Sequence, residues 1–134
     1  MGAQVRLIAV LLGVCATALA ACACFFLASI CITNRHEKIS NLLGFDFEIS
    51  KAECDTLAKD ASISIFASKV GQARRTLLFK YGPAGVNPYP VITSVDQHTI
   101  QVTVPRVSDV VFQGNNLEGL SVKYDIGVIE YPTK

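Results

Sequence analysis

The sequence predicts an α+β fold that is mostly β, with an N-terminal transmembrane helix ahead of a small globular domain. A long apolar run fills the first quarter of the 134-residue chain, and a capping box follows it. Beyond that box, apolar and polar residues alternate with a period of two. We expect four parts: an N-terminal tail, a transmembrane anchor or signal segment, a juxtamembrane connector and a β-rich domain, at residues 1–6, 7–32, 33–49 and 50–134.

Residues 7–32 have the length and composition of a membrane-spanning helix, and they carry no charged side chain. At about 1.5 Å per residue the helix would be roughly 39 Å long, which exceeds a hydrocarbon core of about 30 Å. Gly13, Thr17 and Ala21 share one helical face, and small residues in that pattern let two helices approach and form an oligomer. The segment therefore predicts a single-pass protein whose first partner is membrane lipid.

Two other fates of this segment stay open. Residues 19–22, Leu-Ala-Ala-Cys, resemble a bacterial lipobox, in which Cys22 is lipidated and becomes the mature N-terminus. Ala18 and Ala20 have the small-x-small spacing of a signal-peptidase site. The apolar residues 23–32 favour the uncleaved anchor, because a signal peptide usually ends where polarity begins.

A short tail before one span is typical of a signal-anchor, so the domain is expected on the extracytoplasmic, periplasmic side of a bacterial cell envelope. All acidic residues and every basic residue except Arg6 follow Ile32, which leaves the domain without a net charge to attract nucleic acid. Only Cys54 lies beyond the apolar run, and this predicts a domain without an internal disulfide.

The connector is followed by a capping box at residues 50–53, Ser-Lys-Ala-Glu, which predicts a helix over residues 51–61. Alternation then predicts about six mainly antiparallel strands, near residues 63–67, 74–81, 91–95, 99–104, 107–113 and 120–128. Short turns between them favour a small sandwich or a partly open barrel.

No spacing of residues indicates a metal site, a phosphate loop or a catalytic constellation, so we expect no cofactor and do not favour an enzyme. Cys54 is the one conceivable nucleophile, and it has no evident base partner. His98 is expected at a hairpin tip.

The expected interaction surface has two parts. Residues 82–90 form a proline-rich loop, and loops of this kind often carry recognition. The nearby basic cluster includes two consecutive arginines. The residues selected are Tyr81, Pro88, Tyr89, Arg74 and Arg75. The predicted function is a membrane-anchored domain with a structural or protein-binding role, and its alternative is a small enzyme or ligand-binding domain whose site is assembled from separated residues.

Overall fold

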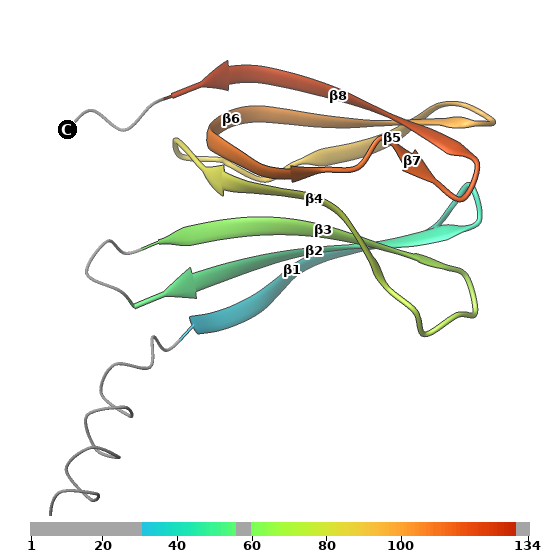
Figure 1. Ribbon diagram of the computed structural model, residues 1–134, viewed down its shortest axis with the longest axis horizontal. Helices are drawn as coiled ribbons and strands as arrows, with labels where there is room; N and C mark the ends of the chain where they lie inside the picture. Colours follow the sequence, from blue (N-terminus) through green and yellow to red (C-terminus); the bar gives the residue numbers. More distant parts are fainter. Residues whose placement is uncertain (1–30, 56–59, 131–134) are drawn as a thin grey trace, which may run out of the picture. The chain divides into compact units, whose positions relative to one another are not determined.

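The computed structural model describes residues 31–55 and 60–130. All the regular secondary structure in these ranges is β-strand (Figure 1). The strands are β1 (Cys31–Leu42), β2 (Phe45–Cys54), β3 (Ala61–Lys69), β4 (Thr76–Pro83), β5 (Val91–Asp96), β6 (Thr99–Gln113), β7 (Asn116–Leu117) and β8 (Leu120–Ile129). They form one sheet in the order β1-β2-β3-β4-β6-β8-β7, and β5 pairs with β6 outside this path. The predicted β-rich content is confirmed. The predicted α+β class is wrong, because the described residues contain no helix. The predicted small sandwich or partly open barrel is also wrong, because the strands form one open sheet.

The capped helix predicted for residues 51–61 is wrong. Strand β2 continues through Cys54 and β3 begins at Ala61. Ser50, the predicted cap, is instead a buried strand residue that pairs with both β1 and β3. The strand forms hydrogen bonds with a neighbour on each side, and it buries the alternate side chains Phe47 and Ile49. Together these interactions outweigh a local capping preference.

The transmembrane helix predicted for residues 7–32 has no counterpart among the described residues, in which no helix is long and apolar enough to cross a membrane. The two residues of that segment that are described, Cys31 and Ile32, begin β1. The remainder, together with the lipobox-like Cys22, lies outside the described residues. Residues 33–49, the expected connector, lie within β1, β2 and the turn between them, so they belong to the sheet.

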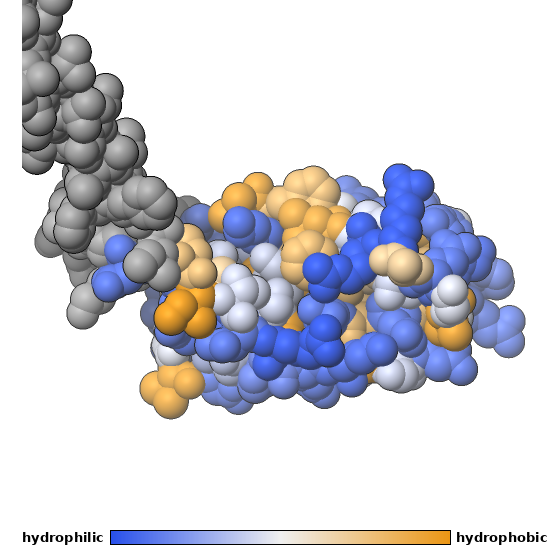
Figure 2. All heavy atoms as spheres, turned by 90° about the horizontal axis from the view of Figure 1, so that it is seen from below, coloured by the Kyte–Doolittle hydropathy of each residue, from blue (hydrophilic) through white to orange (hydrophobic). Residues whose placement is uncertain are grey.

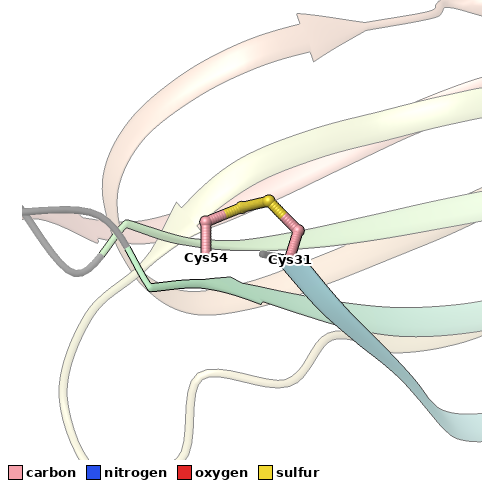
Figure 3. The surroundings of a disulfide bond; sticks show 2 residues. All are labelled: Cys31 and Cys54. Carbon is pink, nitrogen blue, oxygen red and sulfur yellow. A yellow bond between two sulfur atoms is a disulfide. The ribbon is translucent and has the colours of Figure 1, made fainter. Parts of the chain in front are cut away.

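A disulfide joins Cys31 and Cys54, contrary to the prediction that the domain has none (Figure 3). The two residues lie directly opposite each other where β1 begins and β2 ends. The prediction failed because Cys31 was counted with the apolar run, whereas the sheet starts at this residue. The bond links the first residue of β1 covalently to the last residue of β2.

Strand β6 changes partners along its length. Its first part pairs with β5 and, in parallel, with β8, whereas its last part pairs with β4. At the bend, Pro105 lies beside Gly127 of β8, where a Cβ atom would be only 2.7 Å from the Pro105 carbonyl oxygen. Parallel strands normally need a long crossover. Here the second half of β6 is the crossover, so a short turn suffices to start β8.

The bend folds the sheet over one hydrophobic core (Figure 1). An aromatic contact connects β4 to β8, because the Phe79 ring lies 4.8 Å from the Tyr124 ring. Within β4, the Phe79 ring lies 5.1 Å from the Tyr81 ring. The Tyr124 hydroxyl lies within donating distance of the Gly114 and Leu78 carbonyls. Burial raises the pKa of Tyr124 to about 12, so the hydroxyl remains a donor at neutral pH. The largest fully buried side chains are Tyr81, Phe47, Phe79, Ile49, Ile63, Ile65, Leu78, Ile100, Val102, Val104 and Val107.

Candidate functional site

Residues 84–90, here called the proline loop, connect β4 to β5 and are attached to the core through Tyr81. Tyr81 is fully buried, and its hydroxyl donates a hydrogen bond of 2.6 Å to the Pro88 carbonyl. Burial raises the pKa of Tyr81 above its ordinary value, so this donor keeps its proton. Pro90 is buried as well, which fixes the loop where β5 begins.

The ring of Tyr89 attaches the same loop to the edge strand β1. It stacks on His36 with ring centroids 3.4 Å apart and an angle of 4° between the planes. His36 lies at an irregularity of β1, where Arg35 and Glu37 pair with consecutive residues of β2 and His36 is left between them. A bulge of this kind redirects a side chain, and in this sheet it brings the imidazole against Tyr89.

A third contact holds the start of the loop against the bend of β6. Gly85 has φ +76°, a conformation that favours glycine, and a Cβ atom there would lie 3.0 Å from the Arg106 side chain. The Arg106 guanidinium in turn donates a 2.8 Å hydrogen bond to Glu130, just beyond β8. The proline loop is therefore fixed by a tyrosine, a stacked ring and a packed arginine.

The fixed loop presents an aliphatic side chain to solvent. Gly85, Val86 and Asn87 are exposed, and Val86 has the largest relative exposure of the large hydrophobic residues that the structure describes, 104%. A prearranged loop loses little conformational freedom on binding. The loop therefore has the properties of a recognition element.

The two predicted arginines lie elsewhere, in the connection before β4. Arg75 forms a 2.9 Å ion pair with Glu48 and lies 5.0 Å above the ring of Phe66. Arg35 of β1 pairs with the same carboxylate at 2.9 Å. These residues line a shallow depression of about 410 Å³ on the outer face of β1, β2 and β3. Arg74 is exposed and does not line this depression.

The structure thus divides the predicted interaction surface in two. Pro88 and Tyr89 belong to the proline loop, where both are half-buried, while Arg75 lines the outer depression. Tyr81 is in the core, so its ring is not available to a partner. Figure 2 shows the molecule from the β1 side, where hydrophilic residues cover most of the surface and hydrophobic residues form separate groups.

Comparison with protein-family models, curated proteins and solved structures finds no match to this chain. Cys54 is oxidised in the disulfide, so it has no free thiol. His98 lies in the β5–β6 turn, where its backbone N–H donates to Asp96. That bond, followed by one from Thr99, lowers the pKa of the Asp96 carboxyl. Residues 31–55 and 60–130 contain no group of three acidic, histidine or cysteine side chains placed to hold a metal.

Three residues of these sites were missed by the sequence reasoning. His36 has no sequence signal, because nothing in the sequence shows that a bulge turns it toward a distant tyrosine. Arg106 lies between the strands predicted at residues 99–104 and 107–113, and nothing nearby in the sequence indicates its contact with Gly85. The pairing of Cys31 had a signal in the sequence, because Cys31 is the last cysteine of the apolar run and Cys54 is the next cysteine along the chain.

Proposed function

We propose that this chain is a single-pass membrane protein whose sheet lies outside the cytoplasm of a bacterial cell and binds another protein. The observation that carries the proposal is the Cys31–Cys54 disulfide. Such bonds persist in the periplasm and outside the cell, whereas cytoplasmic thiols are kept reduced. The bond supports an extracytoplasmic domain. The basic residues on the two sides of the apolar run nearly balance, so they do not decide the orientation.

The proline loop supports the protein-binding part of the proposal. Its contacts with Tyr81, His36 and Arg106 hold Val86 in a fixed, exposed position. Exposed apolar groups with polar surroundings are common at sites of protein contact. The half-buried Tyr89 of the same loop adds an aromatic ring, and tyrosine is enriched among the residues that dominate binding energy.

The placement is tested by labelling thiols in intact cells that make the full chain. The background variant replaces Cys15, Cys22 and Cys24 by alanine and keeps the disulfide pair. We expect a membrane-impermeant maleimide to label it only after reduction. In the same background, Cys31→Ser frees Cys54, which should react without a reductant, and labelling after denaturation controls for burial.

The proposal would be contradicted if the two-cysteine background were labelled without a reductant, and if only a membrane-permeant reagent labelled it. That result would mean that the pair is reduced and that the domain is in the cytoplasm.

A lipoprotein acylated at Cys22 is the second candidate, and the lipobox-like residues 19–22 favour it. It keeps the same disulfide and the same domain, so the labelling does not distinguish it from the anchor. The mass of the mature N-terminus of the wild-type chain distinguishes the lipoprotein from the anchor. An uncleaved anchor begins at Met1 or Gly2, whereas a lipoprotein begins at an acylated Cys22.

Protein binding is tested by placing a photo-crosslinking residue at Val86 in the full chain. Val95, exposed at the other end of β5, is the matched control. We expect a discrete crosslinked product at Val86 in intact cells and none at Val95. Equal products at both positions, or none at Val86, would contradict a recognition role of the loop.

A further inference from the structure

The last part of β6, residues 108–113, forms an edge of the sheet that is here called the β6 edge. On one side it pairs with β4 (Figure 1). On the other side the pairing with β8 ends at Val107, whose carbonyl accepts a hydrogen bond from the Glu130 N–H. Among the residues that the structure describes, no strand pairs with this side beyond Val107. The β6 edge therefore presents a row of backbone groups to which another strand can pair.

The side chains of the β6 edge are apolar although they face solvent. Val110, Val111 and Phe112 are 40%, 58% and 44% exposed. In the described part of the chain, no other three consecutive large hydrophobic residues are all exposed. Asp109 is the one charged residue of the segment. Because β-branched and aromatic residues favour strand pairing, an apolar edge of this kind is a site where a strand adds.

The other free edges of the sheet have features that oppose such pairing. In β1 a bulge lies among charged side chains. Strand β5 is only six residues long, and β8 carries Lys123 and Asp125 beyond its pairing with β7. Short strands, bulges and charged side chains all discourage the addition of a strand. The β6 edge has a bulge as well, at Val111, but the residues on both sides of it are apolar.

We propose that the β6 edge pairs antiparallel with the same edge of a second copy of this chain. With Val111 opposite its own equivalent, Val110 of each copy lies opposite Phe112 of the other. Pairs of an aromatic and a β-branched side chain stabilise neighbouring strands. The same register places Asp109 opposite Gln113. A parallel arrangement would instead place the two Asp109 carboxylates side by side, and like charges directly opposite each other are destabilising.

The pairing forms a closed, symmetric dimer. Each copy uses its β6 edge, and the edges that stay free are those that bulges, charges or shortness protect, so the assembly does not extend into a filament. One pair of strands is a small interface, so the dimer dissociates on dilution. The hydrophobic core of each copy is complete without it. This inference goes beyond the proposed function, because it depends neither on the anchor nor on the proline loop.

Crosslinking through introduced cysteines tests the register. In the background without Cys15, Cys22 and Cys24, the purified full chain carries Val111→Cys or, as the matched control on the same strand, Asp109→Cys. Under mild oxidation we expect a product of twice the mass with Val111→Cys only. In the proposed register the two introduced thiols at position 109 are four residues apart along the strands, about 13 Å, which is beyond the reach of a disulfide. No product at position 111, or as much at position 109, would overturn the inference.

The mass of the full chain in detergent tests whether this edge makes the dimer. Light scattering over a range of concentrations should show the wild-type chain changing from one copy to two. Val111→Lys should stay a single copy, because two lysines would face each other. Val70→Lys, at an exposed position in the turn after β3, is the control and should behave as the wild type. A wild-type chain that is monomeric throughout, or a Val111→Lys variant that still forms dimers, would refute the pairing.

Amide hydrogen exchange gives a readout that does not depend on a variant. In the wild-type chain, residues 109–113 should exchange slowly in concentrated samples and rapidly after dilution, whereas β3 should stay protected in both. Slow exchange of residues 109–113 in the diluted, monomeric chain would mean that the chain covers this edge by itself, and the inference would be wrong.

Discussion

The central strands and the edge strand β1 belong to one sheet but are held in different ways. In β2 and β3 alternate side chains are buried, in β4 Leu78, Phe79 and Tyr81 are fully buried, and Phe79 contacts the rings of Tyr81 and Tyr124. In β1 the first eight side chains are exposed, and Ile39 and Leu42 alone are half-buried. The edge strand depends instead on its backbone pairing with β2, on the disulfide, on the His36–Tyr89 stack and on ion pairs to Glu48 and Asp46.

The difference shows how an edge strand is kept in place without a hydrophobic face. Long unpaired edges invite pairing with other chains, and charged side chains and bulges discourage it. In β1, Arg35, Glu37 and Lys38 surround one irregularity, and a second one follows Ile39. Damage to the central strands should therefore unfold the whole sheet, whereas damage to β1 should loosen β1 first.

The largest effect is expected from Phe79→Ala. Removing a fully buried ring leaves a cavity, so we expect the free energy of unfolding to fall by about 3–5 kcal/mol. Guanidinium denaturation of the full chain in detergent measures it. Phe112→Ala is the matched control, because Phe112 is 44% exposed. A similar loss in both variants would contradict the central role of the Phe79 cluster.

The next effect concerns the covalent bond at the start of β1. Cys31→Ser opens a loop that the disulfide closes across 23 positions, and we expect a loss of about 3 kcal/mol in unfolding free energy. Amide hydrogen exchange should rise in β1 more than in β3. Cys54→Ser should have the same effect, and the double variant should lose no more than either, because all three remove one bond. Uniform loss of protection in both strands would refute the proposed difference.

Alkaline pH should act on the central region. Burial raises the pKa of Tyr124 to about 12 and that of Tyr81 above its ordinary value. Because the neutral phenols are favoured in the folded state, their contribution to stability is complete below about pH 10 and is lost as pH rises through the folded values. Phenolate absorbance and circular dichroism should change together. Ionisation of both tyrosines near pH 10 in a folded sheet would disprove their burial.

A smaller effect is expected from His36→Ala. Aromatic pairs contribute about 0.5–1.5 kcal/mol beyond the area they bury, so loss of the stack should increase amide exchange in the middle of β1 and in the proline loop. His98→Ala in the exposed β5–β6 turn is the control and should leave both unchanged. Unchanged exchange in the His36 variant would mean that the stack contributes nothing to the attachment of β1.

The smallest effect is expected from Arg75→Ala on the outer face. Exposed ion pairs contribute below about 1 kcal/mol, and the Arg75 side chain is 52% exposed. Thermal unfolding should shift only slightly, and Arg74→Ala, whose side chain is exposed next to it, should not shift it at all. A loss of stability as large as that expected for Cys31→Ser would show that the outer face contributes as much to stability as the disulfide.

The sequence by itself determined the β-rich character of the domain, because alternation with a period of two is a local property of a half-buried strand. It also singled out the proline loop, since prolines and glycines restrict the backbone wherever they occur. Tyr89 and Pro88 were selected on that ground, and the structure places both in a fixed loop.

Only the tertiary structure decided the rest. Residues 50–53 carry a valid capping box, yet pairing with β1 and β3 holds them in a strand, because many distant contacts outweigh one local preference. The partner of Cys54, the neighbour of His36 and the burial of Tyr81 all depend on which strands adjoin. Strand order is set by long-range packing over the bend at Pro105, and no short stretch of sequence encodes it.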